Sequence, residues 1–260
     1  MQLDLRPSRL WVLTVSIAAV FLSSCQAEET EEKKYIKFLG FRLGEVWPGP
    51  EEKLYSHANE ELIIRDFFGD RKGGTFLDVG CSTPIEFSTT YYLEKHLGWS
   101  GIGIDALHEY APEYRRLRPK TKFYSYFVTD HSDEPQDFYR VIGADGLSSG
   151  NKDGPMIKDM PKAKRKVPTI TLNELLEQND VTSIDFMSMD IEGGAPKALA
   201  GFDIKKYQPK LICIEAGGQK AFIETYFTAH GYERIEKYRP FDFVNWYYAP
   251  AASTEQAEAR

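Results

Sequence analysis

Four acidic residues stand where short apolar runs end, and they are the residues in this sequence best placed to do chemistry. Asp78, Asp105, Asp190 and Glu215 each close a run that reads as a buried strand. The carboxyl ends of parallel strands meet at one edge of an open α/β sheet, where ligands bind. A single acid at the end of a strand is as often a helix cap as a ligand-binding residue. Four in equivalent positions predict a shared ligand site.

The loop after the first of these strands indicates which ligand this is. A dinucleotide needs a G-x-G-x-x-G loop for close contact with its pyrophosphate. Here Ser82 takes the place of the second glycine, and Pro84 removes a backbone amide. S-adenosyl-L-methionine has no phosphate and carries a sulfonium, an ammonium and a ribose diol, which suit carboxylates. We therefore favour S-adenosylmethionine over NAD, with Asp105 accepting both ribose hydroxyls.

Composition excludes several classes of protein. The 260 residues are 42% hydrophobic and 13% aromatic, which excludes a wholly disordered chain. The formal net charge of −7 argues against a nucleic-acid partner, because nucleic-acid binding needs a basic surface. Three cysteines exclude a disulfide framework, and we expect Cys81 and Cys213 to be free.

The first 25 residues resemble an export signal. Arg6 and Arg9 precede an apolar stretch over 10–22, and small residues lead to Cys25. Leu22-Ser23-Ser24-Cys25 is similar to a bacterial lipobox, which predicts a lipid on Cys25 and a membrane-associated lipoprotein. The alternatives are an uncleaved anchor or a misassigned start. If the leader is not processed, we expect a cytoplasmic protein.

The remaining chain divides into a tether and N-terminal extension over 26–53, a domain over 54–249 and a disordered tail over 250–260. Within the domain, strands alternate with helices, which predicts a parallel sheet with helices on both faces. Predicted strands cover 75–80, 102–105, 122–128, 183–190 and 211–215, with an antiparallel hairpin over 232–238 and 243–248. Predicted helices cover 54–68, 88–97, 171–177, 195–200 and 219–230, and another begins at Pro112.

Several motifs together resemble the FkbM family of methyltransferases. The run FLDVG over 76–80 is similar to motif I of class I methyltransferases, and STTYYLEKHLGWSGIGID over 88–105 extends the likeness. A second signature comprises VPTITL over 167–172 and DFMSMDIEG over 185–193, followed by matching residues through Glu215. The resemblance covers about residues 54–248. It implies a seven-stranded Rossmann-like sheet of order 3-2-1-4-5-7-6, with the last strand pair antiparallel and helices on both faces.

The resemblance also implies an activity and a cofactor site. The family transfers a methyl group from S-adenosylmethionine, usually to a hydroxyl of a sugar or natural product. Asp78 and Gly80 would shape the methionine pocket, together with Ser82 of the same loop. Asp105 would bind ribose, and Asp190 would lie beside the methyl donor.

Methyl transfer to a hydroxyl also needs a group that removes the acceptor's proton. Asp190 is the first candidate for this general base, and Glu192 is the alternative. Either acid could instead pair with the sulfonium, or bind a divalent ion together with Glu215. No His-rich ligand set supports a metal, so we assign none.

Two further features allow more than one interpretation. The basic run Lys162–Lys166 lies in a long Gly- and Pro-rich segment over 143–168, which we expect to be a loop. The run is either a solvated surface or a lid that recruits an anionic acceptor. His57 and His131 are either surface or capping residues or face the same opening as the acids.

Two rival functions remain at this point. S-adenosylmethionine is a cytosolic compound, which conflicts with an export signal. The alternative is a non-catalytic, membrane-tethered lipoprotein that binds a ligand or glycan through a methyltransferase-like fold. A nucleotide-dependent oxidoreductase is the weakest possibility, because the loop at Ser82 and Pro84 suits a pyrophosphate poorly.

Overall fold

The computed structural model describes residues 55–154 and 157–251. All of these residues belong to one of the chain's two compact units, 35–260. The predicted leader, the predicted tether and the tail beyond residue 251 lie outside the described residues. No helix in the described part of the chain is long and apolar enough to cross a membrane.

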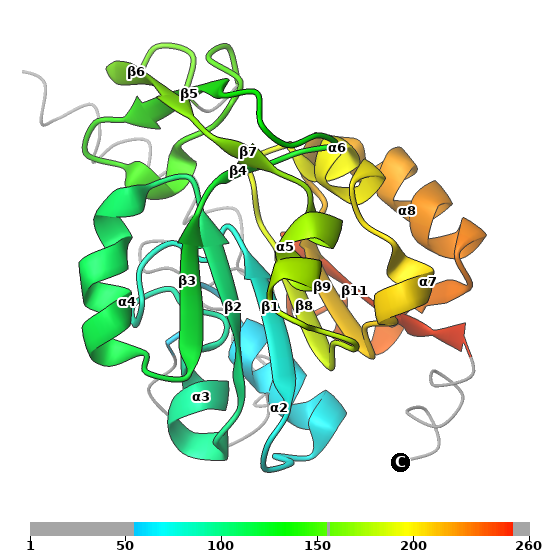
Figure 1. Ribbon diagram of the computed structural model, residues 1–260. Coiled ribbons are helices and arrows are strands. Elements are labelled where there is room, and N and C mark those ends of the chain that lie inside the picture. Colours follow the sequence, from blue (N-terminus) through cyan, green and yellow to red (C-terminus); the bar gives the residue numbers. More distant parts are fainter. Residues whose placement is uncertain (1–54, 155–156, 252–260) are drawn as a thin grey trace, which may run out of the picture. The chain divides into compact units, whose positions relative to one another are not determined.

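A seven-stranded sheet forms the centre of the fold (Figure 1). Its strands lie in the order β3 (Thr121–Ser125), β2 (Ser100–Asp105), β1 (Thr75–Val79), β8 (Phe186–Met189), β9 (Leu211–Glu215), β11 (Asn245–Pro250) and β10 (Tyr232–Arg234). Strands β3, β2, β1, β8 and β9 run parallel to one another, and β11 is antiparallel to both of its neighbours. The predicted order, 3-2-1-4-5-7-6 with an antiparallel last pair, is therefore confirmed.

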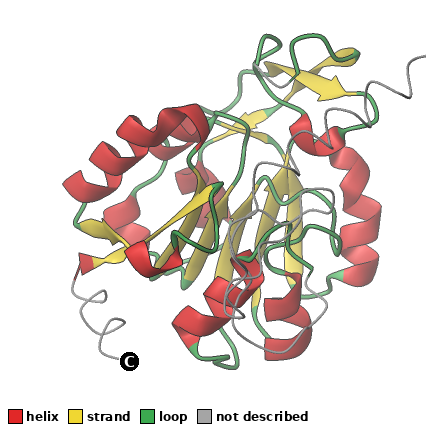
Figure 2. Ribbon diagram, turned by 180° about the vertical axis from the view of Figure 1, so that it is seen from behind, coloured by secondary structure: helices red, strands yellow, loops and turns green. Residues whose placement is uncertain are grey.

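Helices cover both faces of this sheet (Figures 1 and 2). Side chains alternate along each strand, so Leu77 and Val79 face one side while Phe76 and Asp78 face the other. The Leu77 side packs against α5 (Leu172–Gln178), α6 (Ala195–Ala200), α7 (Ile204–Tyr207) and α8 (Lys220–Ala229). The Phe76 side packs against α2 (Glu60–Phe68) and α3 (Tyr91–Leu97). On α4 (Ala111–Leu117), Tyr114 stacks on Phe123 of β3.

Local signals set several helix ends. The Thr171 side chain accepts a hydrogen bond from the Glu174 amide, which is the N-cap of the predicted capping box at α5. Gly69 and Gly98 end α2 and α3 in the left-handed conformation that glycine adopts without strain. Helix α3 begins at Tyr91 rather than at the predicted Ser88, because Ser88 and Thr90 bond a buried arginine instead.

The first strand of the C-terminal pair is shorter than predicted. Strand β10 ends at Arg234, and the one-turn helix η4 (Glu236–Tyr238) follows where the prediction extended the strand. Pro250, assigned to the tail from sequence, is the last residue of β11 and pairs with Tyr232. The antiparallel pairing itself is as predicted.

The predicted loop over 143–168 is wrong in its second half. Lys162–Val167 forms strand β6, which pairs antiparallel with β5 (Gln136–Val141), a strand that the sequence analysis missed. The chain enters and leaves this hairpin through the short parallel pair β4 (Phe127–Val128) and β7 (Thr169–Ile170). Lys164 and Lys166 both pair with Asp137 across the hairpin, so charge pairing replaces the usual apolar pattern of a strand. The hairpin lies beyond the carboxyl ends of the central strands, at the top of Figure 1.

A buried arginine joins α4 to the loop after β1. Arg118, which is 1% exposed, pairs with Glu94 at 2.7 Å and donates to the carbonyl of Pro84 at 2.9 Å. It also donates to the hydroxyls of Ser88 and Thr90, each at 3.1 Å. Removing only one partner of a buried charge pair strongly destabilises a protein.

We predict that Arg118→Met lowers the free energy of unfolding by about 3–5 kcal/mol, because it leaves the buried Glu94 carboxylate without its cationic partner. The double variant Arg118→Met/Glu94→Leu should recover part of this loss. Arg116→Met, in the same helix but 68% exposed, is the matched control and should stay within about 0.5 kcal/mol of wild type. Urea denaturation measures all three. If Arg118→Met is as stable as the control Arg116→Met, the structural role of Arg118 is contradicted.

Candidate functional site

The register of the parallel strands places four predicted residues in one row. Val79 pairs with Ile104 of β2 and with Met189 of β8, and Met189 pairs with Ile214 of β9. The next residue on each strand is therefore Gly80, Asp105, Asp190 or Glu215, side by side at the carboxyl edge of the sheet. Three of the four acids expected at this position, Asp105, Asp190 and Glu215, therefore occupy it. Asp78 does not, because it lies two residues before Gly80 and pairs with Gly103 and Ser188.

A cavity of about 550 Å³ opens at this edge. All six site residues predicted from sequence line it: Asp78, Gly80, Ser82, Asp105, Asp190 and Glu192. His57 lines it as well, whereas His131 does not and instead bonds Asp130 and Gln136. The volume is typical of a site for a small molecule or cofactor.

Asp105 is held by the backbone of two loops. Its Oδ2 accepts from the Ser82 amide at 3.0 Å, and its Oδ1 accepts from the Leu107 amide at 2.8 Å. Burial raises the pKa of Asp105 to about 6 despite these two bonds. Each carboxylate oxygen keeps a second lone pair. Asp105 therefore offers two further acceptor positions at a fixed place in the cavity wall.

Gly80 is required by the close approach of two strands. Its φ of +82° is a conformation that L side chains rarely adopt, and a Cβ there would lie 1.8 Å from the carbonyl oxygen of Asp190. Neighbouring Asp78 is 4% exposed and accepts from the Thr90 hydroxyl at 2.7 Å. Burial raises the pKa of Asp78 to about 6. The carbonyl of Asp190 thus fills the place of a side chain at position 80, and Asp78 is tied to Arg118 through Thr90.

Carboxyl groups crowd at the β8 and β9 end of the row. Burial, then the neighbouring charges of Glu215, Glu192 and Glu60, raise the pKa of Asp190 well above its ordinary value. The Asp190 and Glu215 side chains lie within hydrogen-bonding reach of one another. Burial and then Glu215 raise the pKa of Glu192 to about 7. Burial and the neighbouring carboxylates therefore disfavour a second negative charge at this end of the row.

The turn that carries Glu192 is clamped on several sides. Glu192 has a φ of +49° and Gly193 a φ of +85°. Glu215 accepts hydrogen bonds from both of their amides. The Ser149 hydroxyl donates to the Glu192 carbonyl at 3.2 Å, and the Gln219 side chain, from the one-turn helix η3 (Gly217–Gln219), donates to the Gly193 carbonyl. These contacts hold the Glu192 carboxyl at the cavity wall.

The sequence analysis missed two parts of the site. The segment 143–150 (GADGLSSG) lines the cavity along its whole length, and its Gly and Ser content was the only signal of a close-packed loop. Glu60, at the start of α2, also lines the cavity. It is 5% exposed and accepts from the Ala58 amide and the Asn245 side chain. Burial, then the charge of Asp242, raise the pKa of Glu60 to about 7.

Positive charge is missing from the described cavity wall. None of the described residues that line it is Lys or Arg. Within the described ranges, no three His, Cys, Asp or Glu side chains are grouped so that they could hold a metal ion. Cys81 and Cys213 are both buried and free, as expected.

The sequence model of the FkbM methyltransferase domain matches residues 78–234. This protein belongs to the FkbM methyltransferase family. The match begins at Asp78, within β1, and ends at the last residue of β10, so it includes the whole acidic row. No curated protein matches the chain significantly.

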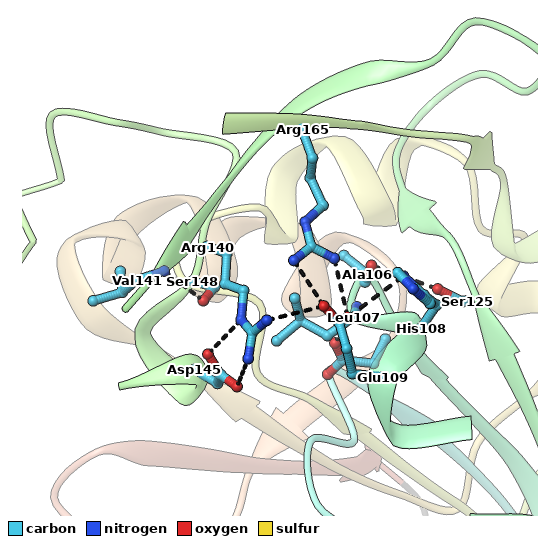
Figure 3. A network of polar contacts seen from close by, with 11 residues as sticks. Ala106, Leu107, His108, Glu109, Ser125, Arg140, Val141, Asp145, Ser148 and Arg165 are labelled. Carbon is cyan, nitrogen blue, oxygen red and sulfur yellow. Dashed lines mark hydrogen bonds and ion pairs between the residues drawn. The ribbon is translucent and has the colours of Figure 1, made fainter. Parts of the chain in front are cut away.

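In this member of the FkbM family, an ion-pair network fastens the 143–150 segment over the cavity (Figure 3). Glu109, in the one-turn helix η1 (His108–Tyr110) after β2, accepts from Arg165 at 3.0 and 2.8 Å and from Arg140 at 3.0 Å. Arg140 also donates two bonds of 2.7 Å to Asp145, which starts the one-turn helix η2 (Asp145–Leu147). The network thus joins the loop after Asp105 to the β5–β6 hairpin and to the cavity wall.

The basic run of β6 belongs to this network, and its side chains do not line the cavity. Arg165 binds Glu109, and the bond from Arg165 lowers the pKa of Glu109 to about 2. A carboxyl whose pKa is lowered on folding stabilises the fold at pH values above its ordinary pKa near 4.5. That stabilisation is lost as the pH falls through about 2. The network therefore persists at neutral pH.

We predict that Glu109→Gln accelerates amide hydrogen exchange in 143–150 about fivefold, which corresponds to a local loss of about 1 kcal/mol. Exchange in β1 and β8 should be unchanged. Glu113→Gln, in the adjacent helix and paired only at the surface with Arg116, is the matched control. Equal exchange in the two variants would show that the network does not hold the segment.

Proposed function

We propose that this protein is an S-adenosylmethionine-dependent O-methyltransferase that methylates a hydroxyl of a sugar or another small molecule. The observation that carries the proposal is the fixed Asp105 carboxylate, with two acceptor positions left, in one cavity with the Asp190 and Glu192 carboxyls. Membership of the FkbM family supports methyl transfer in general. The cofactor, the acceptor hydroxyl and the roles of the residues are our inference.

The residues present fit this cofactor. A vicinal ribose diol needs two acceptors on one carboxylate, which Asp105 provides. The positive charge of a sulfonium suits a wall with raised carboxyl pKa values and without Lys or Arg among its described residues. The same wall is poor for a pyrophosphate. Ser82, whose amide orients Asp105, lies beside this carboxylate at the cavity wall.

When bound, S-adenosylmethionine supplies an electrophilic methyl group on its sulfonium. The protein's part is to orient the acceptor hydroxyl and to take its proton. We assign the general base to Glu192, although the sequence placed Asp190 first. A base works best with a pKa near the working pH, and that of Glu192 is about 7. Asp190, whose pKa burial and the Glu215 charge raise well above its ordinary value, would lie beside the donor.

An uncharged acceptor suits the cavity better than an anion. The sequence allowed the basic run at 162–166 to be a lid that recruits an anion. Its side chains instead pair with Asp137 and Glu109, and none lines the cavity. An anionic acceptor would meet Glu60, Asp190 and Glu192 without a compensating cation on the described wall.

Membrane association through the N-terminal segment is a separate part of the proposal. It rests on the basic, apolar and small-residue pattern that ends at Cys25. A lipid on Cys25 would tether the domain to a membrane through the charged stretch that follows.

We predict that Asp105→Ala weakens binding of S-adenosylmethionine and of S-adenosylhomocysteine by about 10- to 100-fold, because two hydrogen bonds to a carboxylate are lost. Isothermal titration calorimetry measures both ligands. Asp130→Ala, which changes an exposed acid away from the cavity, should bind as wild type. Asp105→Asn keeps the side-chain shape and tests whether the loop remains folded. Unchanged affinity in both Asp105 variants would reject the ribose contact.

Substitution of the proposed base should slow catalysis without changing cofactor affinity. We predict that Glu192→Gln lowers kcat about 100-fold or more, while S-adenosylhomocysteine binds within threefold of wild type. In wild type, kcat/KM should rise as the pH rises toward about 7, because Glu192 must lose its proton. Tritiated methyl transfer to a panel of sugars measures the rate. If Asp190→Asn removes this pH limb and Glu192→Gln keeps it, Asp190 is the base.

We predict that Cys25→Ser moves the full-length protein from the membrane fraction to the soluble fraction. The substitution removes the thiol to which a lipid would be attached. Ser24→Ala, which keeps a small residue before the cysteine, is the control and should stay in the membrane fraction. Immunoblots of fractionated cells measure the distribution. Retention of the Cys25→Ser variant in the membrane would reject the lipid anchor.

A further inference from the structure

Glu60 lines the cavity from a part of the chain that the family model does not match. It is the first residue of α2, and the match begins only at Asp78, in β1. The Glu60 side chain is 5% exposed. Among the described residues, no Lys or Arg forms an ion pair with it. A buried carboxylate without a cation is costly, so its presence in a cavity wall indicates a cation that a ligand brings.

Neutral donors hold the Glu60 carboxyl in place. Its Oε1 accepts from the side-chain amide of Asn245 at 3.2 Å, and its Oε2 accepts from the Ala58 amide at 2.6 Å. The same Asn245 nitrogen donates to Asp242 at 3.1 Å, and the Tyr247 hydroxyl donates to Asp242 at 2.7 Å. This frame fixes the Glu60 carboxyl without supplying positive charge, and it joins Glu60 to a second carboxyl.

Glu60 and Glu192 approach Asp190 from different elements of the fold. The charges of both raise the pKa of Asp190. Glu192 lies on the turn after β8, whereas Glu60 lies on α2 and is bonded by Asn245 of β11. The pKa of Glu192 is raised by burial and by Glu215, and not by Glu60. Glu60 and Glu192 therefore flank Asp190.

The three substituents of a sulfonium match this arrangement. The sulfur of S-adenosylmethionine carries the ribose, the methyl group and a short chain that ends in an α-ammonium and an α-carboxylate. In the proposed function, the ribose binds Asp105, and the methyl group faces an acceptor whose proton goes to Glu192. The third substituent is left with the other acid that lines the cavity beside Asp190, which is Glu60.

We propose that Glu60 binds the α-ammonium group of the cofactor's methionine part, with Asn245 as the residue that positions its carboxylate. This inference rests on the proposed function, because it takes Asp105 for the ribose. The α-carboxylate next to the ammonium needs a donor, which the Thr89 hydroxyl in the described cavity wall can provide. Recognition of the amino group thus comes from α2 and β11, outside the residues that the family model matches.

The test uses two ligands that differ only in this group. One is S-adenosylhomocysteine, and the other is its analogue in which hydrogen replaces the α-ammonium. Isothermal titration calorimetry on the full-length protein measures both, with displacement of S-adenosylhomocysteine where the analogue binds weakly. We expect wild type to bind S-adenosylhomocysteine about 10- to 100-fold more tightly than the analogue, because the analogue lacks one charge-assisted contact. Equal affinities in wild type would overturn the inference.

Glu60→Gln should remove this discrimination, because glutamine keeps the size of the side chain and loses its charge. We expect its affinity for S-adenosylhomocysteine to fall about 10-fold or more. The analogue keeps the α-carboxylate and should bind at least as tightly as to wild type. Glu86→Gln, which removes an exposed negative charge from the loop after β1, is the control and should behave as wild type. An equal loss for both ligands would show that Glu60 serves only the fold.

Proton release gives a second measurement on wild type alone, which holds even if Glu60→Gln does not fold. The pKa of Glu60 is about 7, so the group is partly protonated at pH 7. An ammonium beside it favours the carboxylate and expels protons. Calorimetry in two buffers of different ionisation enthalpy should therefore show more protons released with S-adenosylhomocysteine than with the analogue. The other titratable groups near Glu60 meet the same remaining ligand atoms in both titrations; they are Asp190, Asp242, Tyr247 and Cys213. Equal release would contradict the contact.

Asp105→Ala separates the failure of this inference from failure of the proposed function. It should weaken both ligands by the same factor, because both carry the ribose. If wild type does not bind S-adenosylhomocysteine, the proposed function is wrong, and the inference falls with it. If Asp105→Ala weakens both ligands and Glu60→Gln still discriminates as wild type does, the ammonium contact is wrong and the cofactor site stands.

Discussion

Crowding of carboxyl groups at one edge of a parallel sheet is the constraint on which the rest of this structure depends. The register sets Asp105, Asp190 and Glu215 beside one another, and the described cavity wall offers them no Lys or Arg. Burial and mutual repulsion raise several of their pKa values. An acid whose pKa is raised in the folded state holds more protons there than in the unfolded chain. These acids therefore reduce stability as the pH rises from about 4 to 7, a cost typical of functional sites.

Stability lost at the acidic edge is offset by contacts just outside it. Arg118 is a buried cation that reaches Glu94, the hydroxyl of Thr90 and the backbone of the loop after β1. Through Thr90 it is connected to Asp78, and through Pro84 and Ser88 it holds the loop that carries Phe87. One side chain therefore ties the end of α4 to the wall of the proposed site. The Glu109 network plays a similar part at the surface, where it joins the loop after Asp105 to the segment over the cavity.

Sequence and structure agree where local signals are strong. The buried runs at 75–80 and 211–215 became strands, and the capping box at Thr171 starts α5. They disagree at β5 and β6. KAKRKV has no apolar alternation, and it forms a strand because its lysines pair with Asp137 on the partner strand. Such pairing depends on a residue 27 and 29 positions away from the two lysines, which propensity over a short window does not include.

The sequence by itself determined the fold class and the strand order, and it placed Asp105, Asp190 and Glu215 at the carboxyl edge. Apolar runs, glycine stops and the family motifs are local properties that can be read along the chain. Only the tertiary structure decided how the acids affect one another, because the pKa of Asp190 is raised by Glu215 on another strand. It also decided that Glu60 and Phe87 reach the cavity, where Ser56, just before α2, forms a bridge with Phe87 in the loop after β1. Electrostatic coupling and backbone strain arise from contacts between distant segments, so no local pattern encodes them.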